Sequence, residues 1–145
     1  RQRELVLAAR KPTPEQVAQA KELLAQPQQP DKLPHQRTYA GRILQLHEAS
    51  ATIPVLLQAL RIGDVGIAAI PFETFVETGL ELKARSPLKP AFTISIANGY
   101  FGYLPTPEQH RLGGYESWLG TSKAEIEAST KITAALLEML AQMKP

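Results

Sequence analysis

Two apolar runs on either side of the dipeptide Gly63-Asp64 constrain the fold of this chain more than any other feature. Residues 52–62 and 65–70 are rich in Ile, Leu, Val and Ala, which suit the strands of a partly buried sheet. Glycine readily adopts a positive φ at the first position of a two-residue turn, so the pattern predicts an antiparallel hairpin. Apolar and polar residues alternate over 92–97, which predicts a third strand.

Three helix starts carry recognisable capping residues. The tetrapeptide Thr13-Pro14-Glu15-Gln16 combines an N-cap threonine, a first-turn proline and a glutamine three residues after the cap. The same four residue types recur from Thr106 and predict a short helix that Gly113-Gly114 ends. Ser122 and Glu125 have the spacing of a capping box ahead of an apolar stripe, which predicts the start of the last helix.

The mixture of apolar runs and helical patterns indicates an α/β fold with at least three strands. A polar, proline-bearing stretch over 27–34 is expected to form a surface loop. The expected strands are 52–62, 65–70 and 92–97, and the expected flanking helices lie near 13–26, 36–49, 75–84 and 122–142.

Composition excludes several classes of function. The 145 residues carry a formal net charge of +2, and the 16 Lys and Arg residues are scattered, so there is no basic footprint for nucleic acid. The absence of cysteine excludes disulfides and thiolate metal sites. No apolar run approaches the roughly 18 residues that a membrane-spanning helix needs. The chain begins with Arg1 and no signal segment follows, so we expect an excerpt of a longer polypeptide.

Two places stand out as candidate sites. Glu73 follows the apolar run 65–70 where a helix is expected to begin, and ligands often bind at strand ends of α/β proteins. The alternative is that its carboxylate only complements the helix N-terminus. Six of the nine aromatic residues fall between Phe92 and Trp118, in and beside an irregular stretch over 98–120. Such a loop suits ligand binding, or its rings form a small packed cluster under the loop.

Four short motifs occur in order in the middle of the chain. They are Arg61-Ile62-Gly63-Asp64, Ile70-Pro71-Phe72-Glu73, Asn98-Gly99-Tyr100-Phe101-Gly102-Tyr103 and Gly114-Tyr115-Glu116-Ser117. Together, at compatible spacings, they resemble the neutral/alkaline non-lysosomal ceramidase family. The resemblance covers roughly residues 56–120 and continues weakly into the last helix.

The resemblance implies a zinc site and a catalytic tyrosine. In that family one zinc is held by two histidines, a glutamate and a tyrosine, and the last two map onto Glu73 and Tyr103. A further family tyrosine, which stabilises the oxyanion, maps onto Tyr115. Phe72 replaces the glycine of the family's Pro-Gly-Glu motif, a change expected to alter the shape of the pocket. Only part of the family's context is kept after Tyr115.

The implied function is a zinc-dependent amide hydrolase that cleaves the N-acyl bond of a ceramide-like lipid. None of His35, His47 and His110 lies in a motif that matches the family's zinc histidines, so this chain is expected to be the C-terminal portion of the domain and to be inactive alone. The upstream part of the same polypeptide is therefore an expected partner, and the family suggests an extracytoplasmic, secreted or periplasmic location. Two alternatives remain open. One is a non-catalytic relative that binds lipid or glycan through the loop 98–120, and the other is a structural subdomain that completes another chain.

Overall fold

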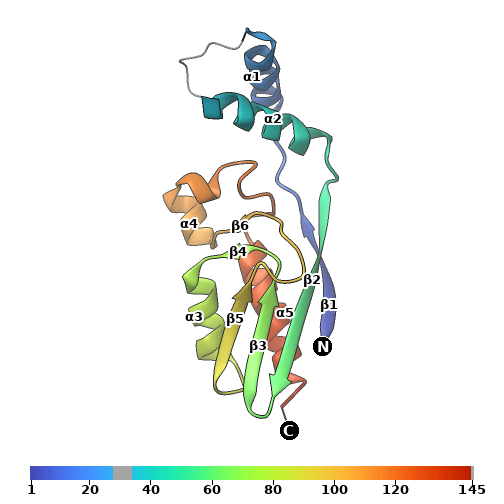
Figure 1. Ribbon diagram of the computed structural model, residues 1–145, viewed down its shortest axis with the longest axis vertical. Helices are drawn as coiled ribbons and strands as arrows, with labels where there is room; N and C mark the ends of the chain where they lie inside the picture. Colours follow the sequence, from blue (N-terminus) through green and yellow to red (C-terminus); the bar gives the residue numbers. More distant parts are fainter. Residues whose placement is uncertain (28–33, 145) are drawn as a thin grey trace.

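The structure, a computed structural model, describes residues 1–27 and 34–144 and contains a four-stranded sheet with strand order β1-β2-β3-β5 (Figure 1). The strands β2 (Thr52–Ile62) and β3 (Val65–Ile70) form the predicted antiparallel hairpin. Gly63 has a φ of 59° in the turn, which is the conformation that favours glycine there. The hairpin and the α/β class are therefore confirmed.

The strand β1 (Gln2–Ala8) was not predicted from the sequence. It pairs with β2 antiparallel along its whole length, from Gln2 opposite Gln58 to Ala8 opposite Thr52. The alternation of apolar and polar residues in this strand is weak, because polar and charged residues fill its first half and only Leu7 is fully buried. The strand owes its structure to pairing with β2 rather than to its own composition, which explains why the sequence did not reveal it.

The third predicted strand, β5 (Ala91–Ser95), lies beside β3 and runs parallel to it. Parallel neighbours need a crossover connection, and α3 (Val76–Arg85) supplies it, close to the predicted range of 75–84. The crossover sets the position of the site described below. It brings the ends of β3 and β5 to the same edge of the sheet, because parallel strands end on the same side.

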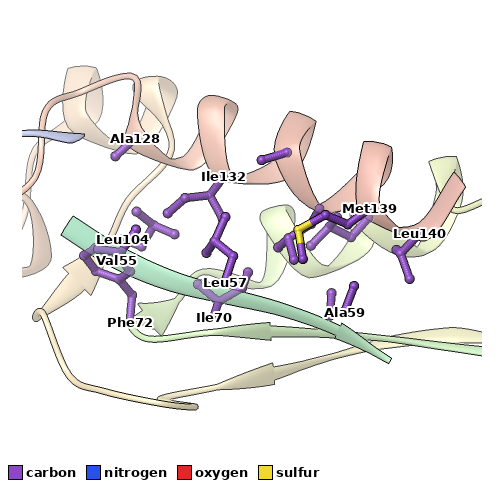
Figure 2. Packing of buried hydrophobic residues seen from close by; sticks show 14 of the residues in the cluster. Val55, Leu57, Ala59, Ile70, Phe72, Leu104, Ala128, Ile132, Met139 and Leu140 are labelled. Atoms are coloured by element: carbon purple, nitrogen blue, oxygen red, sulfur yellow. The ribbon is translucent and has the colours of Figure 1, made fainter. Parts of the chain in front are cut away.

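The core lies between one face of the sheet and the last helix, α5 (Ala128–Ala141), as Figure 2 shows. Every apolar residue of the predicted helical stripe is buried: Ala128, Ile132, Ala135, Leu136, Met139 and Leu140. They pack on Val55, Leu57, Ala59, Ala68 and Ile70, which point from β2 and β3 toward the helix. The opposite face of the sheet keeps large apolar side chains exposed, namely Leu56, Leu60, Phe92 and Ile94.

The predicted capping box at the start of the last helix is wrong. The helix begins at Ala128 with Glu127 as its N-cap, six residues after Ser122. Ser122 instead forms a β-bridge with Gly102, and the Glu125 carboxylate accepts a hydrogen bond of 2.8 Å from the backbone N–H of Ala8. Tertiary contacts therefore use both residues that the local pattern assigned to a cap.

Two further helices, α1 (Pro14–Ala25) and α2 (Pro34–Glu48), pack on one another beyond the end of the sheet (Figure 1). The capping box of Thr13 and Gln16 is present as predicted. Arg37 on α2 ties the pair together by donating to the backbone oxygens of Leu23, Leu24 and Gln26. The loop predicted over 27–34 lies mostly outside the described residues. None of the described helices is long and apolar enough to cross a bilayer.

Candidate functional site

Glu73 and Tyr103 are direct partners in a small sheet at the end of the main one. The strand β4 (Glu73–Thr74) pairs in parallel with β6 (Tyr103–Leu104), with Glu73 opposite Tyr103. The backbone N–H of Glu73 donates to the carbonyl oxygen of Gly102 at 3.0 Å. Neighbours in register on a parallel pair point to the same face, so the two predicted ligand side chains share one side of this sheet.

The loop after β5 must reverse sharply to bring Tyr103 back to Glu73. Ile96 and Asn98 both have positive φ, 55° and 65°, and Asn tolerates this conformation whereas a β-branched residue rarely adopts it. Backbone hydrogen bonds hold the turn against the end of β3: Ile96 donates to Phe72 and Phe101 donates to Pro71, each at 3.0 Å. Strained backbone of this kind clusters at functional sites.

Gly102 fixes how closely the returning chain packs. Its φ is 87°, and a Cβ built on it would lie 2.4 Å from the carbonyl oxygen of Thr121. The same carbonyl accepts from the backbone N–H of Tyr103 at 3.1 Å. Only glycine allows this approach, which clamps Tyr103 between Glu73 on one side and residues 121–122 on the other.

Tyr100 holds the carboxylate of Glu73. Its hydroxyl donates to Glu73 Oε1 at 2.6 Å, the length of a charge-assisted O–H···O hydrogen bond. This contact, together with partial burial, raises the pKa of Tyr100. Hydrogen-bond interaction with the same carboxylate, again with partial burial, raises the pKa of Tyr103 to about 12. The carboxylate therefore has two protonated phenols beside it.

The predicted catalytic residue, Tyr115, lies beside Tyr103. It opens the 3-10 helix η1 (Tyr115–Ser117), which follows α4 (Pro107–Leu112) after the two glycines that end α4 as predicted. The ring centroids of Tyr103 and Tyr115 are 5.9 Å apart in edge-to-face geometry. Tyr39 from α2 and Trp118 also stack edge-on against Tyr115, at 6.5 and 5.7 Å. The aromatic loop thus forms a packed cluster, as one of the two interpretations expected, and the cluster adjoins Glu73.

Two hollows meet at Tyr103. One has a volume of about 290 Å³ and lies between α2 and the loop. Its lining includes Arg42, Gln45, Tyr100, Tyr103, Tyr115, Thr121 and Lys123. The other has a volume of about 370 Å³ and is lined by Glu73, Thr74, Phe75, Ser95, Ile96, Tyr103 and Glu116. The three predicted site residues therefore lie around two adjoining hollows rather than on separate faces of the fold.

The described residues offer half of a zinc site at most. Within 1–27 and 34–144, no group of three or more His, Cys, Asp or Glu side chains is placed to hold a metal ion. Catalytic zinc normally takes three protein ligands. Glu73 supplies a carboxylate oxygen and Tyr103 a phenol oxygen on the same face, which are chemically suitable donors but two in number.

The structure adds one residue to the site and removes another. Tyr100 was noted within its motif but had no predicted role, and the signal that could have found it is its place three residues before Tyr103. Phe72 was expected to shape the pocket, but it is fully buried in the core and stacks on Phe101 at 5.6 Å. Glu73 lies two residues before Phe75, the N-cap of α3, which makes no side-chain cap hydrogen bond. A complement to the helix N-terminus stays the alternative interpretation of its carboxylate.

The fold of the chain is similar to part of two solved ceramidase structures. A ceramidase complexed with C2 aligns with a TM-score of 0.52 and 19% identity, over 64% of this chain and 15% of the ceramidase chain. The neutral ceramidase from Pseudomonas aeruginosa aligns with a TM-score of 0.56 and 15% identity, over 94% of this chain and 24% of the ceramidase chain. No protein-family model matches the chain, and no curated protein matches it in sequence.

At this level of identity the similarity establishes a shared fold. The neutral ceramidase-like relationship that the motifs indicated is confirmed to that extent. The chain spans 15% and 24% of the lengths of the two ceramidase chains, so it corresponds to a part of them.

Proposed function

We propose that this chain is the C-terminal portion of a ceramidase-type, zinc-dependent amide hydrolase that cleaves the N-acyl bond of a ceramide-like lipid. The observation that carries the proposal is the juxtaposition of Glu73, Tyr103 and Tyr115. These residues come from three separate motifs of the ceramidase resemblance, and they meet around adjoining hollows. The similarity in fold to two ceramidases supports the same family of activity.

In this proposal Glu73 and Tyr103 are two zinc ligands. Zinc held there would polarise the amide carbonyl and lower the pKa of a bound water. The hydrogen bond from Tyr100 restricts the carboxylate of Glu73 to one orientation, so Tyr100 is a positioning residue. The two histidines that the resemblance implies would come from the upstream part of the same polypeptide.

Tyr115 acts on the substrate rather than on the metal. Its hydroxyl would donate to the carbonyl oxygen as that oxygen becomes negative, a role that contributes mainly in the transition state. Its edge-to-face packing against Tyr39, Tyr103 and Trp118 orients the ring without a hydrogen bond of its own to a carboxylate. By analogy with the family, we place the enzyme outside the cytoplasm, as a secreted or periplasmic protein.

A second candidate is a non-catalytic relative that binds lipid or glycan through the aromatic loop. The observation in its favour is exposure: Tyr100, Tyr115 and Trp118 are 56%, 42% and 50% exposed despite their packing. Exposed aromatic rings on an ordered loop suit binding to sugars or acyl chains. This binder would keep the affinity for its ligand when Tyr115 loses its hydroxyl.

Amide hydrolysis by the longer polypeptide that contains this chain separates the two candidates, because the binder has no such activity, and kinetics of Tyr115→Phe in that polypeptide then test the role of Tyr115. Loss of an oxyanion donor is expected to lower kcat by about a hundredfold to a thousandfold, with KM and zinc content nearly unchanged. Ser117→Ala removes a hydroxyl from the same 3-10 helix, where it donates to the carbonyl oxygen of Gly114, and serves as the control, with little effect on kcat. An unchanged kcat in Tyr115→Phe would contradict the proposed role.

A further inference from the structure

The hollow between α2 and the loop has an unusual charge. Two cations line it, Arg42 and Lys123, and no Asp or Glu does. Neither cation takes part in an ion pair within the part of the chain that the structure describes. Both side chains are only half-exposed. Two partly buried, unpaired cations around one hollow are a binding feature for an anion rather than an ordinary solvated surface.

Arg42 is held in place by two contacts. The guanidinium of Arg42 lies over the ring of Tyr39, 5.2 Å from its centroid. Gly120 has a φ of 90° and approaches the same side chain so closely that a Cβ would lie 2.9 Å from Arg42 Cβ. A held side chain loses less conformational entropy when a ligand binds. The backbone of Lys123 is fixed as well, because its carbonyl accepts from the N–H of Arg10 at 2.8 Å.

Thr121 forms part of the wall of the same hollow. The residue is only 5% exposed, and its Oγ1 is itself buried without a hydrogen-bond partner among the described residues, as are the hydroxyls of Thr78 and Thr93. The wall at Thr121 therefore shapes the hollow, and the two cations supply its charge.

The neighbourhood indicates what carries the anion. The hollow of Glu73 shares Tyr103 with the cationic hollow and shares Thr74, Phe75 and Ser95 with an apolar groove of about 270 Å³. That groove lies between α3 and β5, and its lining includes the apolar side chains of Phe75, Val76, Leu80 and Phe92 together with Lys83. Apolar groove, candidate reaction site and cationic hollow therefore follow one another. An amphiphile whose acyl chain lies in the groove would place its head group in the cationic hollow.

We propose that the hollow lined by Arg42, Lys123 and Thr121 binds the carboxylate head group of an N-acyl lipid. This rests on the proposed function for the position of the scissile amide, and it goes beyond that function in the substrate, because an anionic N-acyl amino acid takes the place of the neutral ceramide-like lipid. Arginine can bind a carboxylate with two parallel hydrogen bonds, and Lys123 adds a second charge. A volume of about 290 Å³ suits a small head group of amino-acid size.

Binding measured without metal and without turnover tests the proposal independently of catalysis. The probes are N-lauroylglycine, which is anionic, and N-lauroylethanolamine, which is neutral, titrated into the chain by calorimetry below their micellar concentrations. We expect N-lauroylglycine to bind at least about tenfold more tightly, and we expect this ratio to shrink as salt screens the charges. Arg42→Gln/Lys123→Gln should abolish the ratio and leave the affinity for the neutral amide unchanged.

The control is Arg85→Gln/Arg111→Gln, which removes two cations outside the hollow and should keep the ratio. The single variants Arg42→Gln and Lys123→Gln should each lower the ratio, and they replace the double variant as the test if the double variant does not fold. Equal affinity for the two amides, or no detectable binding of N-lauroylglycine, would overturn the proposal. Free laurate that binds more tightly than N-lauroylglycine, and is lost in the same variants, would assign the hollow to a fatty-acid product and overturn the head-group assignment. An unchanged kcat in Tyr115→Phe, with the binding ratio of the two amides intact, would contradict the proposed function and leave the head-group assignment standing.

Discussion

Replacing Gly102 with alanine perturbs the contact on which the geometry of the site depends. The new Cβ would lie 2.4 Å from the carbonyl oxygen of Thr121, whereas ordinary contact begins at 3.4 Å. The two backbones must therefore move apart by about 1 Å, a distance that follows from the difference of these values. That movement breaks the hydrogen bond from Tyr103 N–H to Thr121 and shifts Gly102, which accepts from the N–H of Glu73.

The expected cost follows from two contributions. A positive φ at a non-glycine residue costs about 1–3 kcal/mol, and the lost backbone hydrogen bond adds about 1 kcal/mol or more. We expect Gly102→Ala to lower the free energy of unfolding by about 2–4 kcal/mol in total. Gly113→Ala isolates the first contribution, because Gly113 has a similar φ of 81° and its Cβ would meet nothing within 4 Å.

Guanidinium denaturation followed by circular dichroism measures both variants under the same conditions. Gly102→Ala should be the more destabilising by at least about 1 kcal/mol, the contribution of the clash and the broken hydrogen bond. A cost equal to that of Gly113→Ala would refute the clamp at Gly102. Such a result would mean that the backbone at Gly102 accommodates a Cβ without moving away from the carbonyl oxygen of Thr121.

Two further predictions concern the core and the junction of β1 with α5. Ile70→Ala, at a fully buried position, should lower the free energy of unfolding by about 3 kcal/mol, as measured by denaturation. Ile94→Ala, at 42% exposure, should lower it by less than about 1 kcal/mol. Similar costs would mean that the apolar face with Ile94 is buried too. The hydrogen bonds that the Glu125 carboxylate accepts from Lys131 and from the Ala8 N–H lower the pKa of Glu125. Its contribution to the free energy of unfolding is therefore present above the ordinary pKa of 4.5 and is lost as the pH falls through the lowered pKa. The denaturation midpoint should fall over that acid range, and Glu125→Gln should reduce this pH dependence; an unchanged dependence would remove Glu125 as its source.

Local patterns predicted those elements that are set locally. The hairpin at Gly63 and the helix starts at Thr13 and Thr106 depend on turn and capping chemistry within a few residues, and all three occur as predicted. The start of α5 was misplaced because Ser122 and Glu125 have better partners in Gly102 and Ala8 than in their own helix. Capping patterns do not reveal such competition, because the competing groups are far away in sequence.

The site could be predicted only in part. Glu73 was singled out from its place after a strand, whereas Tyr103 and Tyr115 were assigned through the ceramidase resemblance. The strands β4 and β6 contain two residues each and are separated by 28 positions, so no periodicity announces their pairing. The cationic hollow at Arg42 and Lys123 also escaped notice, because these residues come from α2 and from the segment before α5.

Zinc titration of this chain tests most directly whether Glu73 and Tyr103 form half of a metal site. Complete four-ligand zinc sites have binding free energies of about 10–16 kcal/mol. Half of that, about 5–8 kcal/mol, corresponds to a dissociation constant of roughly 1 µM to 0.2 mM. Calorimetry should give one such weak site, which Glu73→Gln and Tyr103→Phe each weaken at least about tenfold. Glu116→Gln, a carboxylate change in the same hollow, should leave it intact. Unchanged affinity in Glu73→Gln would contradict the assignment of the ligands.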